Sequence, residues 1–265
     1  MKSKRKYIAI VYEGEKTEKA LLKNMTEIFF DQHAETVIFS APACGNIYMI
    51  WKELVDNDFE VDVIEIIRGM NDKTKEILRE LSARDFSEVY LFFDFDPQND
   101  NLPQVYRGTD VIQELLETFN NETEHGKLYL SYPMIESFRE ISSEVESYKS
   151  FYVPLDEVRD YKRLVSESLE FQDFRYITKD KWEVACRASV KRAHLIVNYK
   201  DEIPTYHYFI HELTQGQIYE AQVEKFVKLN KSVGVLNGVP LFLLEYFDES
   251  FWNNIMLQQT EGLYN

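Results

Sequence analysis

Carboxylate side chains follow two of the predicted strands, at points where a divalent cation could bind. Glu13 comes directly after the apolar run of residues 7–12, and Asp94 and Asp96 follow the run of residues 88–93. Alternate residues of an extended chain point to the same side, so Asp94 and Asp96 are expected to share a face. Carboxylates about 4 Å apart repel by roughly 1 kcal/mol in water and about 4 kcal/mol at an effective dielectric near 20. A cation removes this repulsion, and Mg2+ prefers oxygen ligands of this kind.

A cation at this position would polarise a phosphodiester and stabilise the leaving oxygen. It would also attract phosphate to a chain whose formal net charge is −16. That charge otherwise repels a nucleic-acid backbone and excludes a simple basic coat protein. The competing interpretation is structural, because aspartate at a strand end often only caps the next turn or helix. The sequence Glu13-Gly14 at a second strand end favours the metal site over the cap.

The elements expected to position these residues alternate between strands and helices. Runs rich in β-branched and aromatic residues predict strands at 7–12, 37–39, 61–67, 88–93 and 127–132. Helical spacing of apolar residues predicts helices at 16–30, 47–55, 73–81 and 109–119. This alternation is typical of an α/β fold, a parallel sheet flanked by helices on both faces. Ligands of such sheets bind beyond the carboxyl ends of the strands, where these carboxylates are expected.

The second half of the chain shows helical patterns and no strand signals. Helices are predicted at 156–169, 179–199, 206–229 and 240–256. We therefore expect two domains, an α/β catalytic domain over residues 1–145 and a mainly helical C-terminal domain over residues 146–265.

Composition argues against several other classes of protein. The chain has two cysteines and no Cys-x-x-Cys pair, which excludes a disulfide framework and a thiolate zinc cluster and fits a reducing cytoplasm. No apolar stretch reaches about 18 residues, so no membrane-spanning helix is expected. The apolar segment near the start is too short for a secretion signal. The patterns GxxxxGK, GxGxxG and GxSxG are absent, so P-loop hydrolysis, dinucleotide binding and a serine-hydrolase mechanism have no support.

Two motifs resemble those of a known family. Residues 11–18, VYEGEKTE, are similar to the EGEKTE motif that opens the Toprim domains of RloB-like and OLD-like nucleases. Residues 91–96, LFFDFD, resemble the Asp-x-Asp strand of the same domains. The resemblance spans about residues 5–138 and implies a Toprim-like fold. The stretch between the two motifs is longer than in a minimal Toprim unit, which leaves the order of the strands open.

The resemblance also implies the roles of the site residues. It implies that Glu13 is a general acid/base or a metal ligand, and that Asp94 and Asp96 bind Mg2+, for which Mn2+ could substitute. The implied activity is magnesium-dependent hydrolysis of phosphodiester bonds. Whether the substrate is RNA, including tRNA, or DNA stays open.

Weaker features extend the predicted site, each with a structural alternative. Residues 132–138, YPMIESF, are similar to a segment that closes the sheet in RloB-like proteins, so Glu136 is a second-metal ligand or a structural cap. Lys16, near a helix start, is a phosphate contact or an ordinary surface lysine. Glu18 faces the site or is a first-turn carboxylate that the helix dipole favours.

A basic helix face is predicted in the C-terminal domain. Arg187 and Lys191 share a face of the helix expected at 179–199. Such a face could bind a nucleic-acid backbone. Alternatively, it is solvated or paired with acidic side chains of the same chain.

The resemblance further implies a biological setting. Relatives often act in bacterial antiphage defence, including abortive infection, together with an ABC-type or OLD-type ATPase. The absence of a P-loop motif here fits an ATPase supplied by another chain. The expected partners are therefore a nucleic acid and this ATPase, in the cytoplasm, and a homodimer stays open. The alternative function is a non-catalytic Toprim scaffold subunit that docks on and regulates an ATPase.

Overall fold

A computed structural model describes residues 6–31, 36–43, 45–95, 111–140, 151–167 and 173–257. The chain divides into two units by its internal contacts. The first, here the sheet unit, contains the described residues up to Phe93 and from Val111 to Tyr129. The second, here the helical unit, contains Asp94, Phe95 and the described residues from Leu130 onward. The expected domain boundary between residues 145 and 146 stays a prediction.

The first part of the chain forms a five-stranded sheet with helices. Its elements are β1 (Lys6–Tyr12), α1 (Thr17–Phe29), β2 (Thr36–Pro42), α2 (Ile47–Asp56), α3 (Val63–Met70), α4 (Asp72–Ile77), η1 (Ala83–Asp85), β3 (Phe86–Asp94), α5 (Val111–Thr118), β4 (Asn120–Asn121) and β5 (Gly126–Ser131). The strand order is β2-β1-β3-β5-β4. Strand β1 pairs in parallel with β2 and β3, and β4 pairs antiparallel with β5. The expected α/β class, with a mostly parallel sheet, is confirmed.

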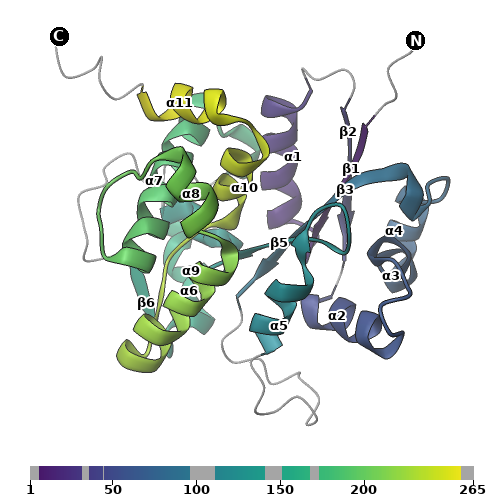
Figure 1. Cartoon of the computed structure of the whole chain (residues 1–265), viewed down its shortest axis with the longest axis horizontal. Helices are drawn as coiled ribbons and strands as arrows, with labels where there is room; N and C mark the ends of the chain where they lie inside the picture. The colour runs from purple at the N-terminus through teal and green to yellow at the C-terminus, as the bar shows by residue number, and fades with distance from the viewer. Residues whose placement is uncertain are drawn as a thin grey trace. The chain divides into compact units, whose positions relative to one another are not determined.

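Strand β1, an interior strand of the sheet, is buried along most of its length. Residues 8–12 are at most 1% exposed, because the strand lies inside the sheet and helices cover both of its faces. Figure 1 shows α1 on one side of β1–β3 and α3 and α4 on the other. Helix α1 buries Leu21, Met25 and Phe29, three of the apolar residues whose spacing predicted the helix.

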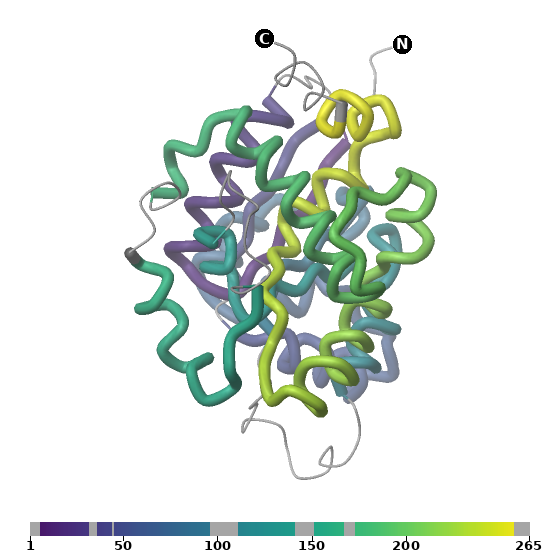
Figure 2. The backbone as a smooth tube through the Cα atoms, turned by 90° about the vertical axis from the view of Figure 1, so that its left-hand side faces the viewer, coloured from purple at the N-terminus to yellow at the C-terminus, as the bar shows by residue number. Residues whose placement is uncertain are grey.

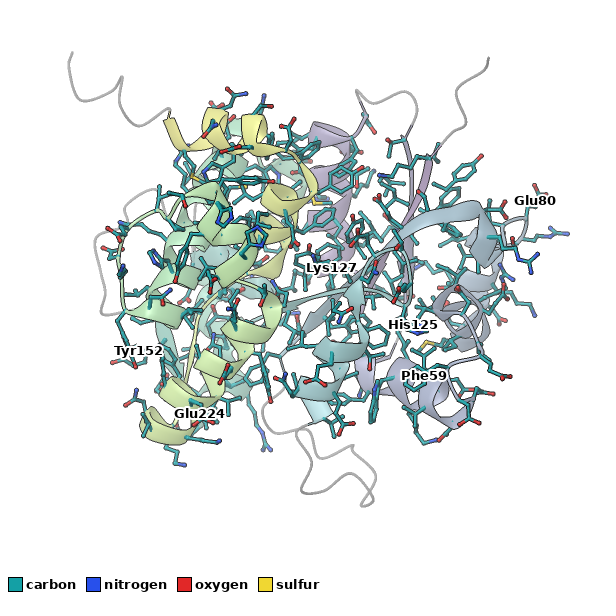
Figure 3. All side chains as sticks on the ribbon, viewed as in Figure 1. Phe59, Glu80, His125, Lys127, Tyr152 and Glu224 are labelled. Atoms are coloured by element: carbon teal, nitrogen blue, oxygen red, sulfur yellow. The ribbon has the colours of Figure 1, made fainter. Side chains whose placement is uncertain are left out.

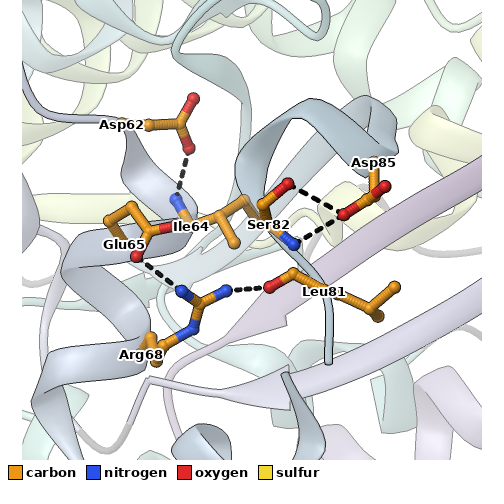
Figure 4. A network of polar contacts seen from close by, with 7 residues as sticks. All are labelled: Asp62, Ile64, Glu65, Arg68, Leu81, Ser82 and Asp85. Atoms are coloured by element: carbon orange, nitrogen blue, oxygen red, sulfur yellow. Dashed lines mark hydrogen bonds and ion pairs between the residues drawn. The ribbon is translucent and has the colours of Figure 1, made fainter. Parts of the chain in front are cut away.

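The predicted strand at 61–67 is wrong, because this segment forms helix α3. The helix begins after Asp62, whose Oδ1 accepts a hydrogen bond from the Ile64 N–H at 2.7 Å (Figure 4). This N-cap satisfies one of the first-turn N–H groups. The apolar side chains of α3 are buried on one face. Burial and capping therefore outweigh the weak strand preference of valine and isoleucine.

Arg68 ties α3 to the segment that leads into β3. Its Nη1 contacts Glu65 Oε2 at 2.6 Å, and its Nη2 donates to the Leu81 carbonyl oxygen. Directly after Leu81, Ser82 and Asp85 form a reciprocal capping box, also drawn in Figure 4. These polar contacts fix the entry of β3, the strand that ends at Asp94.

The turn that follows α2, shortly before Asp62 in the chain, has a left-handed backbone conformation. Asp58 and Phe59 have φ values of 51° and 58°, and the Phe59 N–H donates to the Leu54 carbonyl oxygen at 2.8 Å. The Phe59 ring lies 5.6 Å from the ring of His125, on the turn between β4 and β5 (Figure 3). This contact joins the end of α2 to the hairpin.

The remainder of the chain is mainly helical. Its elements are η3 (Ile135–Glu140), β6 (Tyr152–Pro154), η4 (Val158–Asp160), α6 (Tyr161–Leu164), η5 (Val165–Glu167), η6 (Phe174–Tyr176), α7 (Lys179–Asn198), α8 (Tyr206–Glu212), α9 (Gln215–Ala221), the π-helix η7 (Gln222–Lys228), β7 (Ser232–Gly234), α10 (Gly238–Tyr246) and α11 (Glu249–Leu257). The expectation of no strands here is wrong, since β6 and β7 form an antiparallel pair. Three of the four long predicted helices are broken into shorter ones.

Helix α7 is the long element of the helical unit and packs against α10, as the green and yellow segments of Figure 2 show. It buries Trp182, Cys186 and Val190. Thr178 caps its start by accepting a hydrogen bond from the Lys181 N–H at 3.4 Å. Within the part of the chain that the structure describes, no helix is long and apolar enough to cross a membrane.

The side chain of Gln222, on η7, pairs with the backbone of β7. Its Nε2 donates to the Gly234 carbonyl oxygen at 2.7 Å, and its Oε1 accepts from the Gly234 N–H at 2.8 Å. The amide therefore makes the two hydrogen bonds that a neighbouring strand would make. Gln222 is fully buried.

Candidate functional site

Strands β1 and β3 place Glu13 and Asp94. The parallel register pairs Tyr12, the last residue of β1, with Phe92 of β3. Glu13 follows Tyr12 directly, and Asp94 lies two residues beyond Phe92 as the last residue of β3. Both acidic residues therefore lie at the carboxyl ends of adjacent strands, at the edge where ligands bind in parallel sheets. Both are partly exposed. Asp96 lies outside the described residues.

The loop after β1 is closed by Glu18. The Gly14 N–H donates a hydrogen bond to Glu18 Oε1 at 3.0 Å, from one end of the loop to the first turn of α1. Glu18 is thus a first-turn carboxylate, which the positive end of the helix dipole also favours. Lys16 occupies the N-cap position of α1, and its side chain is exposed. Its predicted contact with phosphate stays a prediction.

The backbone of η3 binds the Asp94 carboxylate. Asp94 Oδ1 accepts a hydrogen bond from the Ile135 N–H at 2.8 Å, and Ile135 is the first residue of η3. The next residue, Phe95, is 4% exposed, and its ring lies 5.0 Å from that of Tyr132. The burial of Phe95 beside a partly exposed Asp94 agrees with the predicted alternation of side chains.

Glu136 lies next to the residue that binds Asp94, and it is buried. Its side chain is 3% exposed, and its Oε1 contacts Lys162 Nζ at 2.5 Å. The Lys162 side chain is 65% exposed, so the ammonium group of the ion pair reaches solvent while the carboxylate does not. The predicted role of Glu136 as a second-metal ligand stays a prediction. In this structure its charge is neutralised by Lys162.

The predicted basic face of α7 has partners within the chain. Arg187 Nη1 donates to the Ile255 carbonyl oxygen of α11 at 2.8 Å. Lys191 Nζ pairs with Asp201 Oδ1 at 3.1 Å, and both side chains are about three-quarters buried. Both cations therefore join α7 to neighbouring segments of the helical unit. Their predicted contact with nucleic acid stays a prediction.

A partly buried cluster of polar and charged side chains, which the sequence reasoning missed, joins η3, α6 and α7. The Tyr161 hydroxyl donates to Glu140 Oε2 at 2.8 Å, and Arg192 Nη2 donates to the Glu140 carbonyl oxygen at 2.9 Å. Burial raises the pKa of the Glu140 carboxyl. The hydrogen bond from Tyr161 and the positive charge of Arg192 lower this pKa and so offset part of the increase. Burial likewise lowers the pKa of Arg192. No local sequence pattern predicts this cluster, because its members come from three distant segments.

The donor chemistry of the strand-end carboxylates fits a hard divalent cation. Among the described residues, no group of three His, Cys, Asp or Glu side chains could hold a metal ion. The third expected ligand, Asp96, falls outside that part of the chain. Mg2+ usually binds through one or two carboxylates and completes its shell with water and substrate phosphate. Glu13 and Asp94 are residues of the required type at the required edge of the sheet.

Comparison with protein-family models, with curated proteins and with solved structures finds no match to this chain. The likeness to Toprim nucleases therefore depends on the two sequence motifs. It is tested by measuring whether the chain has the activity that the motifs imply.

Proposed function

We propose that the chain is a magnesium-dependent nuclease with a Toprim-like sheet, which hydrolyses phosphodiester bonds in RNA, including tRNA, or in DNA. One observation supports this most. The parallel register of β1 and β3 brings the strand ends before Glu13 and Asp94 to the same edge of the sheet. Both Toprim-like motifs contribute a carboxylate there, in the order that the resemblance implies.

In this proposal each carboxylate has a separate role. Asp94, together with Asp96, holds the cation, and the Ile135 N–H orients the Asp94 carboxylate. Glu13 accepts the proton of the attacking water, or supplies one to the leaving oxygen. The bound cation would polarise the phosphodiester and stabilise the charge on the leaving oxygen. Glu136 would serve a second cation only after Lys162 leaves it, since Lys162 neutralises its carboxylate.

The proposed setting is bacterial antiphage defence in the cytoplasm, with an ABC-type or OLD-type ATPase as activating partner. Lys16, Arg187 and Lys191 are the proposed contacts to the phosphate backbone. To bind phosphate, Arg187 would have to leave the Ile255 carbonyl oxygen, and Lys191 would have to leave Asp201.

The proposal is tested by incubating the purified chain with a tRNA pool and with plasmid DNA, alone and with an ABC-type or OLD-type ATPase as the proposed partner. We expect cleavage of one substrate that requires Mg2+, stops on chelation and returns when Mg2+ or Mn2+ is added. Stable co-purification with the ATPase, without cleavage under any metal, would instead support the scaffold alternative.

A further inference from the structure

A backbone N–H group of η3 contributes to the orientation of the Asp94 carboxylate. Asp94 Oδ1 accepts its hydrogen bond from Ile135 at 2.8 Å. A hydrogen bond to an ionised acceptor is strong, and it weakens steeply when the donor turns away from the acceptor. Whatever fixes the peptide groups around Ile135 therefore also fixes the carboxylate.

Asn237 binds the backbone carbonyl of Ile135, whereas Asp94 binds its N–H. Its Nδ2 donates to the Ile135 carbonyl oxygen at 2.9 Å and contacts Ser137 Oγ at 3.0 Å. One amide group thus fixes the first turn of η3 at two points. Asn237 is 1% exposed, so bulk water does not compete for its hydrogen bonds.

Asn237 is itself held in place by two further sets of contacts. Its Oδ1 accepts from the Val239 N–H at 3.1 Å and caps the start of the buried helix α10. The preceding residue, Leu236, exchanges two backbone hydrogen bonds with Tyr132, at 2.7 and 2.9 Å. The amide therefore extends from a rigid segment, as a group that orients another residue must.

We infer that Asn237 is a positioning residue for Asp94. Its amide holds the carbonyl of the peptide that follows Ile135, and this restrains the backbone at Ile135 so that the N–H of the preceding peptide meets the carboxylate. The expected effect of Asn237 on metal binding rests on the proposed function. The hydrogen bonds that link Asn237 to Asp94 through Ile135 do not depend on that function, so the metal binding and the link are tested separately. The competing view is that Asn237 only caps α10.

Two variants separate positioning from capping. Asn237→Asp keeps the oxygen that caps α10 and loses both amide donors. Asn237→Ser is neutral, can still cap the helix, and is too short to reach Ile135. Gln222→Glu is the matched control, since it makes the same amide-to-carboxylate change at a buried side chain that is hydrogen-bonded to Gly234 and not to Ile135.

The first measurement is the amide signal of Ile135 in proton–nitrogen NMR spectra, in each background with and without Asp94→Asn. In the wild-type and Gln222→Glu backgrounds, Asp94→Asn is expected to shift this signal. In the two Asn237 backgrounds most of that shift should disappear, because the N–H no longer faces the carboxylate. A shift of full size in either folded Asn237 variant would overturn the inference.

The second measurement is the dissociation constant for Mg2+ alone, determined by titration of the full chain. Both Asn237 variants should bind Mg2+ at least about tenfold more weakly, which is typical for loss of a group that orients a ligand. Gln222→Glu should bind as the wild type does. The added charge of Asn237→Asp would by itself favour the cation, so weaker binding by that variant would reflect geometry.

The outcomes distinguish the two claims. Equal Mg2+ affinity of wild type and both Asn237 variants would overturn the positioning role in metal binding. Absence of Mg2+ binding by the wild type would refute the proposed function, and the NMR measurement would still decide whether Asn237 positions Asp94.

Discussion

The Gly14 N–H and the Glu18 carboxylate meet at 3.0 Å and close the loop that carries Glu13. A Cβ atom on Gly14 would lie 2.5 Å from Glu18 Oε1. The carboxylate is the far end of a flexible side chain, so it could move aside, at the cost of the hydrogen bond. Glycine at this position is therefore explained by the close approach of Glu18.

Gly14→Ala is expected to destabilise the fold by about 1 kcal/mol, the usual net worth of one hydrogen bond. In a Glu18→Ala background the same substitution should cost much less, because the clashing carboxylate and its hydrogen bond are already gone. Urea unfolding of the four chains of this double-mutant cycle measures the coupling. Additive effects would show that the two residues do not interact.

Glu13→Gln should reduce nucleic-acid cleavage by at least about 100-fold, the lower range for loss of an acid–base group. Asp94→Asn should also reduce cleavage, because the cation loses a carboxylate ligand. Neither substitution should change the free energy of unfolding by more than about 0.5 kcal/mol, because both side chains are partly exposed. The asparagine oxygen can still accept from Ile135. Cleavage at the wild-type rate by either folded variant would exclude that residue from the site.

Asp62→Ala should destabilise the chain by about 1 kcal/mol, because the Ile64 N–H at the start of α3 loses its acceptor. Asp62→Asn is the matched control, since asparagine caps helices about as well as aspartate. Thermal unfolding of both variants checks this. Equal destabilisation by the two substitutions would assign the role to the charge of Asp62 rather than to capping.

The stability of the chain should carry a pH-dependent contribution from Glu140. Burial raises the pKa of this carboxyl above its ordinary value of 4.5, so the folded chain binds the proton more tightly than the unfolded chain does. The stabilising contribution is therefore fully present below the unfolded pKa, and it is lost as the pH rises through the folded pKa.

Glu140→Gln removes this titration, and its amide oxygen can still accept from Tyr161. The difference in unfolding free energy, wild type minus variant, should accordingly fall as the pH rises above the ordinary carboxyl pKa of 4.5. Urea unfolding at a series of pH values gives this difference directly. A difference that stays constant, or that grows with pH, would contradict the raised pKa.

Much of the sheet could be predicted because its strands are short apolar runs between helical patterns. The strands ending at Tyr12 and Asp94 were found this way. The error at α3 has a local cause. Its valine and isoleucine residues suggested a strand, although Asp62 stands where an N-cap residue would stand and the apolar positions fit a helix as well.

One break within a predicted helix, at the start of α9, has a signal in the sequence. Thr214 and Gln217 form a capping box at the start of α9, a pattern that is visible in the sequence. Strands β6 and β7 have three residues each, which is too short for periodicity to reveal. The hydrogen bond between Ile135 and Asp94 joins residues far apart in the chain, so no local pattern predicts it.

The pairing of Gln222 with Gly234 also bears on self-association. Exposed strand edges recruit strands from other molecules, because their backbone groups lack partners. Here a buried side chain already occupies both backbone groups of Gly234. A foreign strand would have to expel this amide from the core before it could add to the edge. The Gln222 side chain therefore blocks the addition of another strand at Gly234.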